Sequence, residues 1–138
     1  MSDPNCIFCK IVAGEIPCFN LYEDDDTLAF MDINPANEGH VLAIIKAHHA
    51  NVHAIPDDLI GACARTAKRI AGAVEAALSP DGINLVQANG PGADQSVQHF
   101  HIHIMPRRMG DNLTLNWGIN PGDMDAIKAT YEKVRAAL

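Results

Sequence analysis

The chain has 138 residues, a length typical of one domain, and 48% of them are apolar, which is ample for a hydrophobic core. The formal net charge of −7 argues against a nucleic-acid partner, because a general nucleic-acid binder normally shows a basic face. No apolar run approaches the ~20 residues that cross a bilayer. The first residues also lack the basic and apolar regions of a signal peptide. We therefore expect a soluble cytoplasmic protein with no membrane partner.

The first third of the chain is predicted to hold one short helix and three strands. The helix covers Ile7 to Val12, places Cys6 and Cys9 one turn apart, and is ended by the following glycine and proline. Strands are expected at Asn20–Glu23, 27–32 and Val41–Ile45. The last of these is a short apolar run, which is typical of a buried strand.

A long helix is predicted to begin at Pro56, because proline fits a first turn and the two acids after it suit the positive end of the helix dipole. Ser79 and the turn residues after it end this helix. Two strands follow, one at 83–87 and one that ends at Pro106, and a helix at about 124–137 closes the chain. This order predicts an α+β fold with a mostly antiparallel five-stranded sheet, one long helix and a C-terminal helix, the helices packed against one face.

Three histidines alternate with apolar residues in the segment that begins at His99 and continues through His101 and His103. Because successive strand side chains point to opposite faces, the three imidazoles share one face, with neighbours roughly 6.5 Å apart. Like charges this close disfavour one another, so at least one ring is expected to be neutral and to offer a lone pair. A hydrophobic core would gain nothing from three such rings, so we interpret them as functional.

Two chemical interpretations of this face remain open. The histidines could ligate a catalytic zinc, or one could be a nucleophile while the others orient it or bind anionic oxygens. The segment just before them contains Gly90, Gly92, Gln95 and Ser96. Glycine turns can aim N–H groups at an anion, and the hydroxyl and amide add donors. The pattern therefore indicates a phosphate site beside the imidazoles.

The histidine segment and several segments before it resemble the histidine triad family of nucleotide hydrolases and transferases, in its Hint-like branch. The resemblance is carried by Gln95-Ser96-Val97-Gln98-His99-Phe100-His101-Ile102-His103-Ile104-Met105-Pro106-Arg107, Cys6-Ile7-Phe8-Cys9-Lys10-Ile11, Gly14-Glu15-Ile16-Pro17, Tyr22-Glu23-Asp24-Asp25, Ala29-Phe30-Met31-Asp32-Ile33-Asn34-Pro35 and Gly39-His40-Val41-Leu42-Ala43-Ile44. It covers about three quarters of the chain. The C-terminal helix is similar to the extended tails of bacterial members, which implies one HIT domain over 1–138 with an extension at about 109–138.

The resemblance implies a role for each matching residue. His101 would attack the α-phosphorus of a purine nucleotide and form a nucleotidyl-histidine intermediate, which water then releases. His103 would contact the phosphate and assist the leaving group, with His40 as a further active-site histidine. The ribose would be held by Asp32. The base would pack near Ile33, and Asn89, Gln95 and Ser96 would contact the phosphate and leaving group.

Adenosine phosphoramidates or dinucleoside polyphosphates are the substrates that this resemblance implies, with no organic cofactor. A nucleophilic His101 needs its second ring nitrogen to donate to a fixed acceptor, for which we predict a backbone carbonyl. Asp94 stands where close relatives often carry glycine, and an acid there could face solvent or change the leaving-group preference. Rival interpretations are a zinc hydrolase using all three histidines and a nucleotide-binding scaffold with little catalysis.

The spacing of Cys6 and Cys9 is that of structural zinc sites. Members of the wider superfamily that bind zinc imply His48 and His99 as the other two ligands. We read Cys18 and Cys63 as structural thiols, and we expect His49 and His53 to be solvated or to make ordinary hydrogen bonds. The resemblance also implies a homodimer, in which Trp117 and the C-terminal segment could reach the partner's site.

Overall fold

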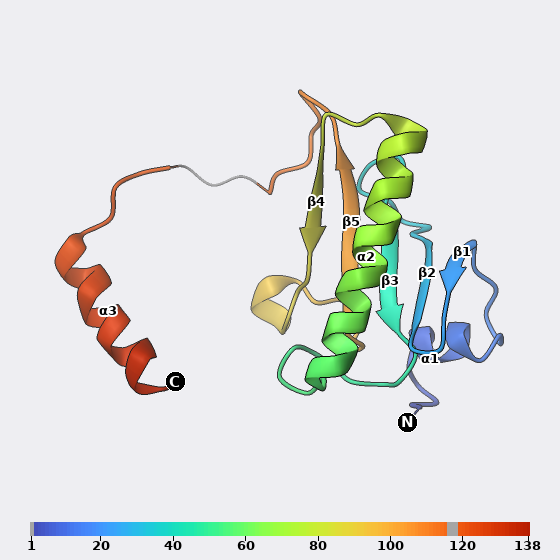
Figure 1. The fold of residues 1–138 in the computed structure, drawn as a ribbon, viewed down its shortest axis with the longest axis horizontal. Helices are drawn as coiled ribbons and strands as arrows, with labels where there is room; N and C mark the ends of the chain where they lie inside the picture. Colours follow the sequence, from blue (N-terminus) through green and yellow to red (C-terminus); the bar gives the residue numbers. More distant parts are fainter. Residues whose placement is uncertain (1, 116–118) are drawn as a thin grey trace.

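The computed structural model describes residues 2–115 and 119–138, and Figure 1 shows a five-stranded sheet crossed by one long helix. The helices are α1 (Ile7–Val12), α2 (Asp57–Leu78) and α3 (Met124–Ala136), with a single 3₁₀ turn, η1, at Pro91–Ala93. The strands are β1 (Asn20–Glu23), β2 (Thr27–Met31), β3 (Val41–Ile45), β4 (Gly82–Val86) and β5 (His101–Arg107). Their spatial order is β1-β2-β3-β5-β4 and every neighbouring pair is antiparallel, so the predicted α+β fold class is confirmed.

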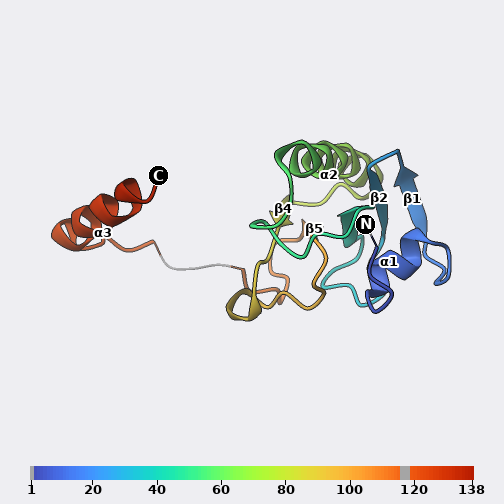
Figure 2. The same ribbon diagram turned by 90° about the horizontal axis from the view of Figure 1, so that it is seen from below.

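The prediction that the helices share one face of the sheet is wrong. Figure 2 shows α2 on one side of the strands and α1 on the other. Along β2 and β3, alternate side chains pack on opposite faces of the sheet. Ala29, Val41, Ala43 and Ile45 belong to the core under α2, whereas Leu28, Phe30, Leu42 and Ile44 pack with α1. Continuous apolar strands such as β3 are what a sheet covered on both faces requires.

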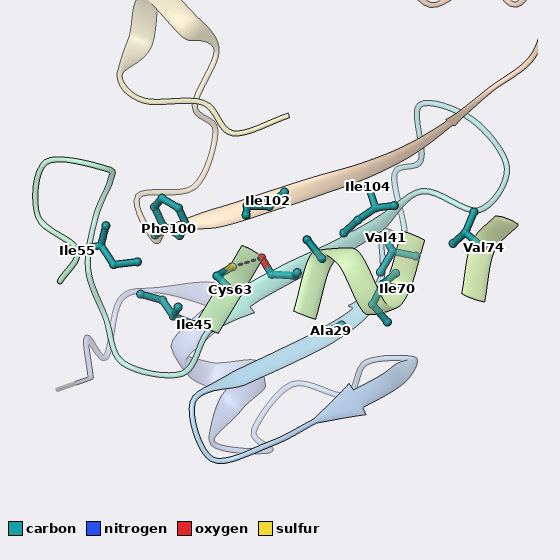
Figure 3. Packing of buried hydrophobic residues seen from close by; sticks show 12 residues of the cluster. Ala29, Val41, Ile45, Ile55, Cys63, Ile70, Val74, Phe100, Ile102 and Ile104 are labelled. Atoms are coloured by element: carbon teal, nitrogen blue, oxygen red, sulfur yellow. Dashed lines mark hydrogen bonds between the residues drawn. The ribbon is translucent and has the colours of Figure 1, made fainter. Parts of the chain in front are cut away.

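The core between the sheet and α2 contains Cys63, which lies fully buried in the second turn of the helix (Figure 3). Its Sγ donates a hydrogen bond to the carbonyl of Ala43 on β3 at 3.4 Å. Burial raises the pKa of this thiol to about 12. A thiol that stays protonated and enclosed is unreactive. The structural role predicted for Cys63 is therefore confirmed.

The histidine strand differs from its predicted bounds at both ends. His99 precedes β5, because the amide of Phe100 donates to the carbonyl of His49 (2.7 Å) rather than to a neighbouring strand. At the other end Pro106 lies inside β5 and pairs with Ile83 of β4. The ladder between β3 and β5 ends at Ile104, so the missing N–H of this proline costs no hydrogen bond to β3.

The closing helix α3 stands apart from the sheet in both ribbon views, and all of its residues are exposed (Figures 1 and 2). Its first turn is capped by Asp123, whose carboxylate accepts the amides of Asp125 (2.9 Å) and Ala126 (3.2 Å). The expected helix therefore forms, although it covers no part of the sheet. Among the described residues, no helix is both long and apolar enough to cross a membrane.

Candidate active site

A cavity of about 430 Å³ opens on the side of the sheet that carries α1. Its walls come from α1, the segment after α1, strands β2, β3 and β5, and the loop before β5. The lining residues include the predicted site residues Asp32, Ile33, His40, Ser96, His101 and His103. Residues that lie far apart in the sequence therefore line one cavity. The rest of the cavity surface is mostly apolar and includes Cys18.

His101 is held in one orientation by its own backbone neighbour. Its Nδ1–H donates to the carbonyl oxygen of His99 at 2.6 Å, as the sequence predicted. The ring is 2% exposed, and this burial lowers the pKa of His101. A neutral imidazole with its proton on Nδ1 carries its lone pair on Nε2. His101 lines the cavity, and a free lone pair held in one orientation is what a nucleophile requires.

A chain of hydrogen bonds sets the tautomers of His40 and His103. The amide of Ala36 donates to His40 Nδ1 at 3.0 Å, so the proton of neutral His40 lies on Nε2. This Nε2–H donates to His103 Nδ1 at 2.9 Å, which leaves the proton of His103 on its Nε2. The rings of His101 and His103 have their centroids 4.8 Å apart. The site therefore places the Nε2 lone pair of His101 beside the Nε2–H donor of His103.

The surroundings of His40 and His103 favour the neutral form of both rings. Burial lowers the pKa of His103 from its ordinary 6.5 to about 4, and neighbouring His101 and His40 act in the same direction. Burial also lowers the pKa of His40, against the opposing charge of Asp32, whose Oδ2 lies 3.6 Å from His40 Nε2. Desolvation disfavours the charged form of histidine, which is the larger effect here.

Acid should destabilise the protein through these histidines. Between about pH 6.5 and 4 the unfolded chain binds protons that the folded His103 does not, so the free energy of unfolding falls as pH falls. We expect His103 alone to account for roughly 2 kcal/mol of this fall, after allowance for its partial exposure. Urea unfolding at several pH values would measure it, with His103→Asn as the comparison. Equal pH slopes for the two proteins would contradict the expectation.

Gly39 positions His40 just before β3. Its φ of +87° lies in the left-handed region, and an added Cβ would meet Leu78 Cδ1 at less than contact distance and Pro106 Cγ at 3.2 Å. We expect Gly39→Ala to lower the free energy of unfolding by roughly 2–4 kcal/mol, from backbone strain and overpacking together. Denaturant unfolding tests this. Gly72→Ala in α2 is the control, because a Cβ there would meet nothing within 4 Å.

The acidic and apolar residues expected to hold a nucleoside both line the cavity. Asp32 follows β2, and its Oδ1 accepts the amide of Asn34 at 2.8 Å, which fixes the carboxylate. Ile33 is 77% exposed although it is apolar. An exposed branched side chain beside an anchored carboxylate offers an apolar surface next to a hydrogen-bond acceptor.

The three polar residues expected to contact phosphate do not all line the cavity. Ser96 lines the cavity. Asn89 and Gln95 are instead engaged in the loops beside it: Asn89 Oδ1 accepts the amide of Val52 (2.8 Å), and Gln95 Nε2 donates to the carbonyl of Ala50 (2.6 Å). Their side chains shape the loop that carries Ser96, and their contact with phosphate stays a prediction.

Asp94 closes η1 with a φ of +57°, a conformation that glycine adopts freely and aspartate tolerates. Its amide donates to the carbonyl of Pro91 at 3.2 Å, and its side chain is exposed. Of the two outcomes considered for this acid, the structure favours the one in which it faces solvent. The amide of Asp94 is occupied within the loop.

Phe8 is a site residue that sequence reasoning missed. Its ring meets His101 edge to face, with centroids 5.2 Å apart and planes at 87°, and it is 6% exposed. The residue lies between Cys6 and Cys9, so the metal motif drew attention away from it. The available signal was the position of Phe8 between two cysteines that are both buried. This position indicates that this face of α1 packs inward.

Beside the cavity the four predicted metal ligands come together. The ligand atoms of Cys6, Cys9, His48 and His99 all lie within 4.8 Å of one another. Sγ of Cys6 is 3.4 Å from His99 Nδ1, and Sγ of Cys9 is 3.4 Å from His48 Nδ1. Tetrahedral zinc with ordinary bond lengths would separate S and N ligands by about 3.6 Å. The donor set and its spacing therefore fit zinc.

The surroundings of the cluster also suit a metal. His99 Nε2–H donates to the carbonyl of Ile45 at 2.6 Å, which turns the Nδ1 lone pair toward the thiols. Asp3 Oδ2 lies 3.8 Å from His48 Nε2. Burial raises the pKa of Cys6, so a nearby cation is what would favour its thiolate. Four protein ligands would leave no open position, which is typical of a structural site.

The same arrangement argues against a catalytic zinc held by the three histidines of the run. Within residues 2–115 and 119–138, the clusters of metal-ligand side chains are the one just described and a group of Asp32, His40 and His103. His99 belongs to the first and His103 to the second. His101 belongs to neither. The zinc-hydrolase interpretation therefore lacks the geometry it needs.

The fold and this site define an α+β protein with a histidine-lined cavity, and comparison with known proteins shows its family. The model of the HIT domain matches residues 13–110, and the chain belongs to this family. "Protein hit" of Bacillus subtilis is 42% identical over 135 residues, covering 94% of this chain and 93% of that protein. Adenosine 5'-monophosphoramidase HNT1 of Saccharomyces cerevisiae is 39% identical over 137 residues, covering 99% and 84%.

Solved structures show the same similarity. The crystal structure of a HIT family protein from Bacillus anthracis superposes with a TM-score of 0.89 at 34% identity, covering 99% of both chains. A zinc-bound histidine triad family protein from Mycobacterium smegmatis superposes with a TM-score of 0.76 at 33% identity, covering 97% of this chain and 98% of that one. Both likenesses extend over nearly the whole chain.

Proposed function

We propose that the protein hydrolyses adenosine phosphoramidates, with release of AMP through a nucleotidyl intermediate on His101. Its broader class, a nucleotide hydrolase of the histidine triad type, rests on family membership and on the phosphoramidase named among its relatives. The observation that carries the finer proposal is the hydrogen bond from His101 Nδ1–H to the carbonyl of His99. It leaves one lone pair, on Nε2, at a residue that lines the cavity.

The reaction proceeds in two displacements. In the first, the Nε2 lone pair of His101 forms a bond to the α-phosphorus as the bond from phosphorus to the leaving nitrogen breaks, and the departing amine takes up one proton. The Nε2–H of His103 is the adjacent donor for the phosphate or the departing group. In the second, water attacks the phosphorus, releases one proton and restores His101. Positioning and hydrogen bonding supply most of the rate in such transfers.

The nucleoside is proposed to occupy the rest of the cavity. A purine fits beside exposed Ile33, and the ribose hydroxyls donate to the carboxylate of Asp32. The phosphate then lies between Ser96 and the two histidines of β5. A cavity of about 430 Å³ is within the range that small-molecule sites occupy. The loop held by Asn89 and Gln95 sets the position of Ser96.

A structural zinc ion is proposed at the cluster of Cys6, Cys9, His48 and His99. The donor spacing supports it, and a zinc-bound family member is known from Mycobacterium smegmatis. The ion would join the N-terminal segment to the loop before β5. With all four positions filled by protein ligands it would take no part in the transfer.

A homodimer is proposed from the state of α3. The apolar side chains of this helix form one stripe at helical spacing: Met124, Ile127, Tyr131 and Val134. A 13-residue helix with an uncovered stripe is marginal by itself in water. A second copy of the chain would cover it. Trp117, which was expected to reach a partner's site, lies outside the described residues. Sedimentation of Ile127→Glu beside the unaltered protein tests this assembly.

Three finer assignments complete the proposal. We assign the chain to the Hint-like branch as a bacterial-type member, with one domain over 1–138 and a tail from about 109. The family match ends at residue 110, at the start of this tail. Net charge of −7 and the absence of a spanning helix in the described part of the chain are compatible with the expected cytoplasmic location.

Intact-mass spectrometry tests the proposed reaction. The protein is mixed with an adenosine phosphoramidate, quenched at short times and weighed. We expect a transient mass increase equal to one AMP, and free AMP at later times. His101→Gly should show neither, whereas His53→Gln, which changes an exposed histidine with no role in the site, should behave like the unaltered protein.

The outcomes separate the rival interpretations. Bound nucleotide without an adduct or AMP release would favour the scaffold. Turnover that requires added zinc in a protein that stays folded without it would favour a metal-dependent hydrolase. Faster turnover of a diadenosine polyphosphate than of the phosphoramidate would show that the protein prefers to cleave P–O–P bonds rather than P–N bonds.

A further inference from the structure

The segment 32–40 carries much of the proposed nucleoside site, and it lies wholly between strands β2 and β3. Asp32, Ile33 and His40 of this segment line the cavity. His40 is buried and passes directly into β3, whereas Ile33 is 77% exposed. The position of the nucleoside-binding half of the segment therefore depends on side-chain contacts rather than on the ladder of the sheet.

Asn37 attaches this segment to the end of β5. Its Nδ2 amino group donates to the carbonyl of Pro106 at 2.9 Å and to Asp111 Oδ2 at 2.8 Å. Its own carbonyl accepts the amide of His40 at 3.2 Å. Both donor positions of the side-chain amide are thus used, and both lead from the segment to β5 and the turn that follows it.

Asp111, the charged acceptor of Asn37, is itself held by several other donors. Arg107 donates from Nε to Oδ2 at 2.8 Å and from Nη2 to Oδ1 at 2.7 Å, a two-point contact that fixes the carboxylate. The amides of Arg108 (3.0 Å) and Leu113 (3.2 Å) also donate to it. The hydrogen bonds from Arg107 are the main reason why the pKa of Asp111 is lowered, so the carboxylate stays ionised.

Arg107 extends these contacts to a second strand, because its Nη1 donates to Asn84 Oδ1 on β4 at 2.8 Å. We call Asn37, Asn84, Arg107 and Asp111 the Asp111 cluster. In the part of the chain that the structure describes, none of the four lines the cavity. The cluster therefore joins the nucleoside segment to two strands of the sheet from outside the site.

We propose that the Asp111 cluster positions the nucleoside-binding segment, and that through Asn37 it sets the affinity for the nucleotide without contacting it. The inference rests on the proposed nucleoside site at Asp32 and Ile33. It makes Asn37 and Asp111 positioning residues, whose effect reaches the ligand through the backbone of residues 32–40.

The expected kinetic signature follows from which side of the site the cluster supports. A segment that is no longer attached samples other conformations, and the apparent Kd rises as the fraction of the binding-competent conformation falls. The nucleophile is oriented separately, because His101 Nδ1–H donates to the carbonyl of His99. Loss of the attachment should therefore raise KM and leave kcat nearly unchanged. A purely structural role would lower Tm and leave KM unchanged.

The experiment changes neighbouring residues of the same segment. Asn37→Ala removes both hydrogen bonds and leaves Asp111 paired with Arg107. Asn37→Asp is a second variant of the same shape, in which an oxygen faces two acceptors, in case the first does not fold. Glu38→Ala is the matched control, because Glu38 is exposed and does not line the cavity. Kinetics with an adenosine phosphoramidate are combined with calorimetric titration of AMP and with thermal unfolding.

We expect both Asn37 variants to raise KM and the Kd of AMP by roughly 5- to 30-fold, with kcat changed less than about threefold. Glu38→Ala should match the unaltered protein. Asp111→Ala should also weaken AMP binding, and the double variant with Asn37→Ala should bind AMP no more weakly than Asn37→Ala alone, since the two residues act through one contact.

An unchanged KM and Kd in folded Asn37 variants would overturn the inference, as would a kcat that falls as far as KM rises. Effects of Asn37→Ala and Asp111→Ala that multiply in the double variant would remove the role given to Asp111. If the unaltered protein binds AMP but forms no adduct, the proposed reaction fails, and the comparison of AMP affinities still decides the positioning role. An unaltered protein that binds no AMP would overturn both.

Discussion

Replacing His101 with glycine is expected to lower kcat by at least about 10⁴-fold, the largest effect on activity of any substitution considered. No other lone pair of the described cavity is set in the same way, because His40 and His103 use theirs as acceptors within the hydrogen-bond chain. Loss of a covalent nucleophile removes the two-step path itself. Steady-state kinetics with an adenosine phosphoramidate would measure the loss.

A chemical rescue separates loss of the nucleophile from loss of structure. The glycine variant leaves a space beside Phe8 that free imidazole can enter, so added imidazole should restore part of the turnover. His103→Gly is the comparison: it removes a hydrogen-bond donor and should keep measurable adduct formation. Unchanged kcat in His101→Gly, with a native circular dichroism spectrum, would contradict the nucleophile assignment.

Removing one thiol of the Cys/His cluster is expected to cause the largest loss of stability. We expect the purified protein to contain one zinc ion per chain and Cys9→Ser to contain none, because the ligand set would fall from four to three. A metal present at 1,000 times its Kd stabilises by about 4.1 kcal/mol. For a domain of this size that amount corresponds to a fall in Tm of roughly 10–20 °C.

Metal analysis and thermal unfolding check this expectation together. Cys18→Ser is the control, since it removes a half-buried thiol outside the cluster and should keep both the zinc and the Tm. A chelator should lower the Tm of the unaltered protein to that of Cys9→Ser. Protein that carries no zinc as purified, and whose Tm ignores both chelator and added zinc, would contradict a metal at this site.

The order of the strands and helices could be predicted from the sequence because local patterns decide it. The alternating run at His101 and the apolar run at Val41–Ile45 are strand signals that depend on nearest neighbours alone. The long helix begins after Pro56 and ends before Ser79 as expected, because proline and a left-handed residue act on the backbone where they stand. Which face each helix covers was mispredicted, since it depends on contacts between distant segments.

The sequence by itself determined which chemistry the protein could carry: three imidazoles on one face and a pair of thiols one turn apart. Only the tertiary structure decided how they divide. In the folded protein His99 contacts the thiols, and His101 keeps one free ring nitrogen. His40 is hydrogen-bonded to His103. The tertiary structure also placed Phe8 against the nucleophile and turned Asn89 and Gln95 toward their loop. The physical reason is that a side chain's protonation, partner and direction depend on atoms that approach it through space, and these come from segments far apart in the chain.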